Sequence, residues 1–167
     1  MVADDALIER AAALLAACRD RGLQLATAES CTGGLVAACL TEVAGSSDVV
    51  DRGFVSYSNA AKTAMLGVPA TLIEAHGAVS AEVAAAMATG ALAHSEADLA
   101  VAVTGIAGPG GATPDKPVGL VYVAAARRGA APGVDRCRFA GDRAAIRRAS
   151  VDRALALLAA LADADPA

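Results

Sequence analysis

The stretch "LQLATAESCTGGLVAACL" (residues 23–40) decides the fold. Its first half is a short apolar run that ends at Glu29, Ser30 and Cys31. In its second half, apolar residues recur at helical spacing. Two glycines separate the halves, so the pattern predicts a strand over 23–29, a tight turn and a helix over 33–43. A strand that passes directly into a helix is typical of an α/β protein.

The rest of the chain continues this alternation of helices and strands. Asn59 is expected to cap a short helix that carries Lys62, and Ser80 to cap the next long helix. We expect a turn, a helical turn and a loop over 67–80. Apolar periodicity predicts further helices over 4–21, 81–93 and 142–163, strands over 49–58 and 97–105, and a hairpin of 118–129 with 133–141.

These elements predict a three-layer α/β/α sandwich around a mixed, mostly parallel sheet. No linker or internal repeat divides the chain, so we expect a single domain over residues 1–167. Hydrophobic residues make up 56% of the sequence, but there are only two Tyr, two Phe and no Trp. The core is therefore expected to consist of Ala, Val, Leu and Ile.

Charge and cysteine usage narrow the class of partner and the compartment. The net charge of −4, without a dense Lys/Arg block, argues against nucleic acid as a partner. No apolar segment reaches the roughly 18 residues of a membrane span, and Asp4, Asp5 and Glu9 do not suit a signal peptide. The four cysteines lack CxxC spacing and are expected to be reduced thiols. We therefore expect a soluble, cytoplasmic protein that binds no membrane.

A second cluster of charge lies late in the sequence. Arginines alternate there with Asp142 and Asp152, which favours a solvated helix face over a track that binds phosphates. The arginines are Arg143, Arg147, Arg148 and Arg153.

Ser30 is the first candidate for chemistry. It follows a strand, where open α/β sheets bind ligands, and N–H groups at the start of the next helix suit a phosphate or an oxyanion. Gly33 and Gly34 would let a ligand approach. The simpler interpretation, which spacing alone favours, is that Ser30 or Thr32 only caps the helix. Cys31 is an alternative nucleophile whose pKa a helix N-terminus would lower, but no histidine partner is evident.

Lys62 is the second candidate, in "SYSNAAKTAML" (residues 56–66). A lysine in a dry site loses basicity and can act as a base toward a neighbouring serine, with the Tyr57 hydroxyl nearby. The alternative is an exposed helix lysine. His76 and His94 lack ligand spacing, so we expect neither a metal site nor a Ser–His–Asp triad.

The loop "GIAGPGGATPDKP" (residues 105–117) is the third candidate. It matches neither the G-x-G-x-x-G dinucleotide motif nor the G-x-x-x-x-G-K-[ST] phosphate loop. Its many N–H groups follow Thr104 and precede Lys116 near the loop's end. They would bind a phosphate or an amide, or the loop is a tight surface turn.

Five motifs, in order, closely resemble the C-terminal domain of the CinA (competence/damage-inducible) family. The resemblance implies an α/β/α fold, often dimeric, that needs no metal or other cofactor. It also implies a stand-alone form without the family's N-terminal pyrophosphatase-like domain. The motifs are "TAESCTGG" (27–34), "GFVSYSNAAKTAMLGV" (53–68), "GAVSAEVAAAMATGA" (77–91), "AVTGIAGPGGATPDKPVGLVYVA" (102–124) and "FAGDRAAIRRASVDRAL" (139–155).

The family's known enzymatic members are amidohydrolases that convert nicotinamide mononucleotide to nicotinic acid mononucleotide and ammonia. The resemblance implies that Ser30 is the nucleophile, assisted by Tyr57 and Lys62. Glu29 is expected to organise the turn by hydrogen bonding. The residues expected to bind the substrate are Thr32, Gly33, Gly34, Thr104, Gly105, Gly108 and Arg143. The alternatives are an inactive nucleotide-binding or regulatory module of the same fold, and an amidase for another small amide.

Overall fold

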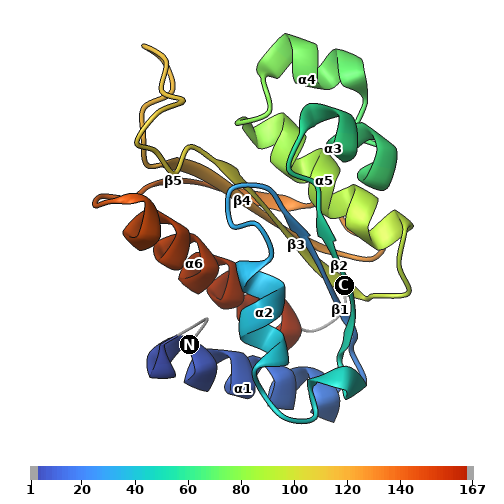
Figure 1. Cartoon of the computed structure of the whole chain (residues 1–167). Coiled ribbons are helices and arrows are strands. Elements are labelled where there is room, and N and C mark those ends of the chain that lie inside the picture. Colours follow the sequence, from blue (N-terminus) through green and yellow to red (C-terminus); the bar gives the residue numbers. More distant parts are fainter. Residues whose placement is uncertain (1–3, 165–167) are drawn as a thin grey trace.

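Residues 4–164 are described by the computed structural model, in which helices cover both faces of a five-stranded sheet (Figure 1). This arrangement is the expected three-layer α/β/α sandwich. In chain order the elements are α1 (Asp5–Asp20), β1 (Leu25–Glu29), α2 (Leu35–Thr41), the 3₁₀ turn η1 (Ser46–Asp48), β2 (Val50–Val55), α3 (Asn59–Leu66), α4 (Ala70–His76), α5 (Ala81–Ala93), β3 (Leu99–Gly105), β4 (Leu120–Arg127), β5 (Gly133–Arg138) and α6 (Arg143–Asp163).

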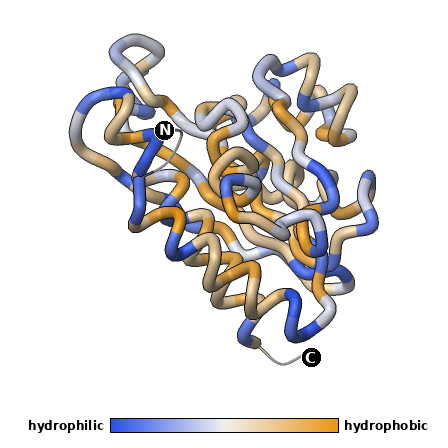
Figure 2. Tube along the Cα trace, turned by 60° about the horizontal axis from the view of Figure 1, so that its bottom comes forward, coloured by the Kyte–Doolittle hydropathy of each residue, from blue (hydrophilic) through white to orange (hydrophobic). Residues whose placement is uncertain are grey.

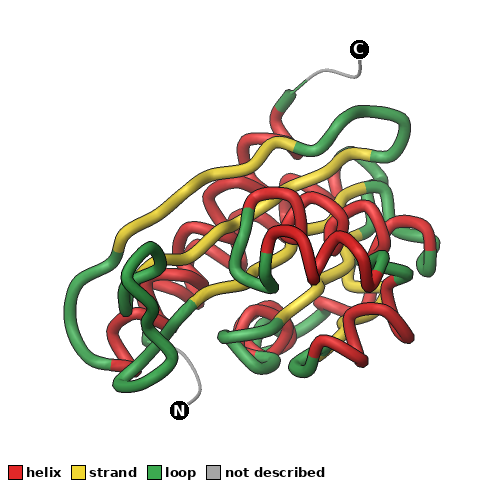
Figure 3. The backbone as a smooth tube through the Cα atoms, turned by 90° about the horizontal axis from the view of Figure 1, so that it is seen from above, coloured by secondary structure: helices red, strands yellow, loops and turns green. Residues whose placement is uncertain are grey.

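The sheet is mixed, with the strand order β2-β1-β3-β4-β5. β1 pairs in parallel with β2 and β3, whereas β4 is antiparallel to both of its neighbours, so every strand except β4 points the same way. Helices α1, α2 and α6 lie on one face, and α3, α4 and α5 on the other (Figures 1 and 3). Among the described helices, none has the length and hydropathy to cross a bilayer.

Two hydrophobic cores lie on the two faces of the sheet. In β3, Leu99, Val101 and Val103 face the core under α1, α2 and α6, and Ala100 and Ala102 face the core under α5. Both sets are fully buried, as expected for a strand covered on both faces. Figure 2 shows hydrophobic and hydrophilic residues interspersed along the helices, as helices with one buried face require. Alanine on the α5 side lets helix and sheet lie close together.

The topology gathers several strand ends at one edge. β1, β2 and β3 are parallel, and Glu29 at the end of β1 is in register with Val55 of β2 and Val103 of β3. The chain leaves β1 toward α2 on one face and leaves β2 toward α3 on the other. Such a divergence opens a crevice at the carboxyl ends of the strands. Ser30 and Tyr57 both lie just beyond this edge.

Two local predictions need correction. Ser58, not Asn59, caps α3, because its hydroxyl accepts a hydrogen bond from the Ala61 N–H at 3.0 Å. The segment after Pro69 forms the seven-residue helix α4 rather than a single helical turn. The cap at Ser80 is confirmed, since its hydroxyl accepts from the N–H of the third residue of α5.

Candidate active site

Ser30 occupies a tight turn between β1 and α2. Its N–H donates to the Val103 carbonyl at 2.9 Å, and its carbonyl accepts from the Gly33 N–H at 3.0 Å. Gly33 and Gly34 have φ values of 59° and 100°, in the left-handed region that favours glycine. The glycines are therefore needed for the shape of the turn, whether or not a ligand approaches them.

The buried carboxylate of Glu29 holds this turn to the start of α2 by hydrogen bonds. Its side chain is 1% exposed, and its two carboxylate oxygens accept hydrogen bonds from the N–H groups of Val36 at 2.9 Å and Ala37 at 3.0 Å. The expectation that Glu29 organises the turn is confirmed. The sequence interpretation had left these N–H groups free for a ligand, which is wrong because the protein's own carboxylate binds them.

Lys62 reaches Ser30 from α3. Its side chain is 1% exposed, and Nζ lies 3.0 Å from Ser30 Oγ, 3.0 Å from the Ser56 carbonyl oxygen and 3.2 Å from the Tyr57 carbonyl oxygen. The alternative of an exposed lysine is therefore wrong. Burial lowers the pKa of the Lys62 ammonium, because desolvation disfavours the charged form.

All three neighbours are oxygens that can accept from Nζ, and an ammonium would use its three N–H groups on them. The neutral amine, which burial favours, has two N–H donors and one lone pair. With its two N–H groups on the carbonyls, the lone pair of the neutral amine faces the Ser30 hydroxyl, which then becomes the donor. A base hydrogen-bonded to a serine in this way can take its proton as the serine attacks.

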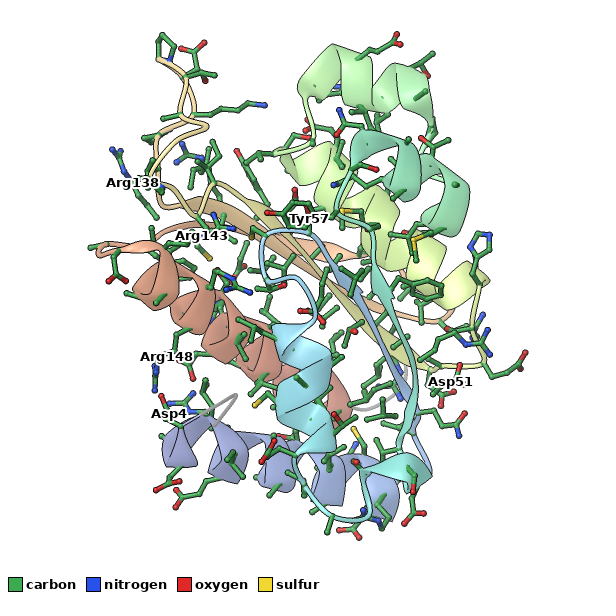
Figure 4. The ribbon with its side chains drawn as sticks, in the orientation of Figure 1. Asp4, Asp51, Tyr57, Arg138, Arg143 and Arg148 are labelled. Carbon is green, nitrogen blue, oxygen red and sulfur yellow. The ribbon has the colours of Figure 1, made fainter. Side chains whose placement is uncertain are left out.

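Tyr57 contributes to the site in two ways. Its carbonyl holds Lys62, whereas its side chain is 58% exposed and its hydroxyl accepts a hydrogen bond from Arg143 at 3.3 Å. Tyr57 and Arg143 are labelled close to each other in Figure 4. The phenol is thus bonded to a guanidinium, and the lysine is held by the backbone of residue 57.

A pocket of about 220 Å³ opens beside Ser30. Arg143 closes one side of it and donates to the Gly108 carbonyl at 2.8 Å. Cys31 also lines the pocket, but burial raises the pKa of its thiol to about 11, opposite to the lowering expected from a helix N-terminus. The lining residues are Ser30, Cys31, Tyr57, Gly105, Ile106, Ala107, Gly108, Gly110, Gly111 and Arg143.

Four predicted binding residues do not line this pocket, namely Thr32, Gly33, Gly34 and Thr104. The Thr104 hydroxyl donates to the Ala78 carbonyl at 2.8 Å and so ties β3 to the loop before α5. Thr32 is fully buried, and its hydroxyl has no hydrogen-bond partner in residues 4–164. Lys116 donates to the His76 carbonyl at 2.6 Å, which holds the glycine loop against α4.

Arg147 was predicted to lie on the solvated arginine face, which is wrong, because its guanidinium binds the turn that carries Ser30. Its Nε donates to the Cys31 carbonyl at 3.1 Å and its Nη2 to the Thr32 carbonyl at 3.0 Å. The interpretation of a solvated arginine face holds for Arg148 and Arg153, which form ion pairs with Asp4 and Asp135. The spacing of the arginines could have indicated this role. Arg147 follows Arg143, a predicted binding residue, by four positions and so lies on the same face of the helix.

Two further features bear on the choice of site. Within residues 4–164, no three His, Cys, Asp or Glu side chains gather where they could hold a metal ion. A larger hollow of about 400 Å³ lies between the β4–β5 hairpin and the C-terminal half of α6. It is at the opposite end of the sheet from Ser30, since Arg127 in its lining is in register with the start of β3.

Fold and site together define a three-layer α/β/α domain with a serine–lysine pair at the carboxyl edge of its sheet. The family model described as "CinA C-terminal domain" matches residues 7–162. The chain belongs to that family.

Relatives and solved structures agree with this assignment. A CinA-like protein of Citrifermentans bemidjiense is 60% identical over 77% of this chain and 31% of its own length. One of Mycolicibacterium vanbaalenii is 56% identical over 93% of this chain and 36% of its own length. The chain thus spans about a third of these relatives. The competence/damage inducible protein CihA from Agrobacterium tumefaciens is similar in structure, with a TM-score of 0.93, 49% identity, and coverage of 95% of this chain and 97% of that chain.

Proposed function

We propose that this chain hydrolyses the carboxamide of nicotinamide mononucleotide to nicotinic acid mononucleotide and ammonia. The observation that carries the proposal is the 3.0 Å contact between Lys62 Nζ and Ser30 Oγ, with the lysine buried and the serine beside a pocket. The choice of substrate follows from the resemblance to the amidohydrolases of the family.

The first half of the reaction forms an ester. Ser30 Oγ attacks the carboxamide carbon while neutral Lys62 takes the hydroxyl proton. The tetrahedral intermediate then collapses, and the carbon–nitrogen bond breaks. The Lys62 ammonium returns its proton to the leaving nitrogen, so ammonia departs and a nicotinoyl ester remains on Ser30.

The second half restores the enzyme. Water attacks the ester carbon, and Lys62 accepts a proton from it. The ester bond to Ser30 breaks, and the serine oxygen regains a proton from Lys62. The product is the carboxylic acid, which passes its proton to ammonia or to solvent and leaves as the carboxylate, and one water is consumed for each ammonia released.

The pocket supplies groups for the rest of the substrate. Arg143 places a guanidinium at the rim, where it would pair with the 5′-phosphate. The loop N–H groups around Gly108 and Gly110 are further donors for the phosphate. The exposed ring of Tyr57 lies at the same rim and offers a face to the pyridine ring.

Incubation of the purified chain with nicotinamide mononucleotide tests the proposal. We expect equimolar ammonia and a product one mass unit heavier than the substrate. The variant Ser30→Ala serves as the blank for contaminating amidases. If the chain releases no ammonia but binds the nucleotide, the inactive-module alternative is correct. Release of ammonia only from other amides favours the generic amidase.

A further inference from the structure

Arg147 spans from α6 to the turn that carries Ser30. It bonds to the carbonyls of two successive residues, Cys31 and Thr32, which precede it by more than 110 positions in the sequence. Its side chain is half-buried, and within residues 4–164 it forms no ion pair with a carboxylate. A guanidinium placed against two backbone carbonyls fixes the orientation of both peptide groups.

The orientation of those peptides determines where their N–H groups point. In a trans peptide the carbonyl and the N–H of the next residue point in opposite directions. The Cys31 carbonyl points to Arg147, so the Thr32 N–H points away from α6. Within residues 4–164, the Thr32 N–H has no acceptor. Thr32 is fully buried and lies outside the pocket lining, so Arg147 acts on the interior of the turn and not on a group that meets the substrate.

The second peptide that Arg147 holds takes part in the turn directly. Its carbonyl is that of Thr32, and its N–H is that of Gly33, which donates to the Ser30 carbonyl. A hydrogen bond from a cation to a carbonyl polarises the peptide group, which makes its N–H a better donor. Arg147 thus strengthens the hydrogen bond that closes the turn at Ser30.

We propose that Arg147 is a positioning residue that presets the Ser30 turn and so holds Ser30 Oγ against Lys62. The inference rests on the proposed function for its reaction, but it concerns the reactivity of Ser30 itself. Arg147 does not contact the serine hydroxyl, and it is not itself among the residues that line the pocket. Its loss should therefore slow the chemical step and leave substrate binding intact.

The test compares Arg147→Ala with Arg148→Ala. Arg148 is the next residue of the same helix, pairs with Asp4 at the surface and is a matched control for loss of a helix arginine. We expect Arg147→Ala to lower kcat for nicotinamide mononucleotide by about 100-fold, the loss typical of misplaced reacting groups, with KM little changed. Arg148→Ala should keep both constants. Added guanidinium ion, far below denaturing concentrations, should restore part of the lost kcat.

A second readout separates this inference from the choice of substrate. p-Nitrophenyl acetate acylates a reactive serine, and mass spectrometry locates the acetyl group. If the native chain is acylated at Ser30 but does not hydrolyse the nucleotide, the proposed function fails, and the acylation rate still tests Arg147. A native chain inert in both assays overturns the inference as well, because there is then no nucleophile to position.

Several results would contradict the role of Arg147. Native kcat and native acylation rate in Arg147→Ala would overturn it. A rise in KM at constant kcat would make Arg147 a binding residue instead. If Arg147→Ala does not fold, Arg147→Lys decides, since it keeps the charge but not the two-carbonyl fork. A folded Arg147→Lys with native kcat would refute the proposal, and a reduced kcat would support it.

Discussion

At the scale of single residues, Ser30 is distinguished from its neighbour Cys31 by environment. Ser30 is half-buried and within 3.0 Å of Lys62, whereas Cys31 is almost fully buried with a thiol pKa of about 11. Ser30→Ala should reduce turnover by several orders of magnitude, as loss of a nucleophile does, without lowering the Tm. Cys31→Ala should stay active. Substantial turnover in Ser30→Ala would transfer the role of nucleophile to Cys31.

The lowered pKa of Lys62 predicts how the enzymatic activity depends on pH. Burial lowers the pKa of its ammonium, and a base acts only when unprotonated, so activity should rise as the pH passes through this lowered value. Lys62→Arg should be inactive at every pH, because a guanidinium keeps its proton in a protein. Turnover of both chains from acidic to alkaline pH gives the comparison. Near-native turnover in Lys62→Arg would make Lys62 an electrostatic anchor.

Residue chemistry was only partly predictable from the sequence. Ser30 and Lys62 are 32 positions apart, and no local pattern shows that one meets the other. The resemblance to a family suggested the pair, and the geometry explains it. The contacts of Arg147 were missed because its partners are backbone carbonyls. Every residue has a backbone carbonyl, so the residue types at those positions do not indicate the contact.

At the scale of elements, α2 depends on a carboxylate that comes from β1. In Glu29→Gln, one oxygen is replaced by an amide nitrogen, which faces an N–H donor of Val36 or Ala37. A buried donor left without an acceptor costs about 1–3 kcal/mol, so the free energy of unfolding should fall by that order. Urea denaturation measures it. Glu42→Gln, at the exposed end of α2, is the control and should unfold like the native chain.

Helices α3 and α5 touch through a glycine. A Cβ added at Gly90 would lie 2.0 Å from the Leu66 carbonyl oxygen of α3, so the two helices would have to separate. Gly90→Ala should lose activity as well as stability, because α3 carries Lys62 toward Ser30. The expected destabilisation is about 1–3 kcal/mol, typical of overpacking. Thr89→Ala, on the exposed side of α5, should change neither the Tm nor the turnover.

Elements with clear periodicity were predicted well, and short ones were not. The helix over 81–93 matches α5, and the fully apolar run before Gly105 became a buried central strand. The cap of α3 was misplaced by one residue because Ser58 and Asn59 are both good capping residues. The helix α4 was underestimated because its seven residues offer too few turns for a periodic pattern.

At the scale of the whole molecule, the site gathers cationic and N–H donors more than aromatic surface. Arg143 and the glycine loop line the pocket, and among the lining residues within 4–164 Tyr57 is the sole aromatic one. Nicotinamide mononucleotide should therefore have a much higher kcat/KM than nicotinamide riboside or nicotinamide. Ammonia release from the three compounds at equal concentration measures this. Comparable kcat/KM for free nicotinamide would favour an amidase without a phosphate site.

The mixed sheet could be predicted from the sequence, because helices were expected between the first strands and a hairpin was expected at the end. Its strand order was less accessible. β1 lies between β2 and β3 although it precedes both, and only this order sets Ser30 beside the Val103 carbonyl. Such long-range pairing depends on how whole faces bury one another, which no short motif encodes.

Arg143 and Arg147 belong to α6, which follows all the other described elements in the sequence. Ser30 and Lys62 lie in the first half of the chain. On the ribosome, the reactive pair therefore emerges well before the two arginines that complete its surroundings. A nascent chain that has reached β4 already contains its nucleophile and base, but not the residues that hold the turn or close the pocket. Under the proposed mechanism, a chain interrupted before α6 would therefore hold the serine and the lysine but would lack both arginines that the reaction is proposed to need.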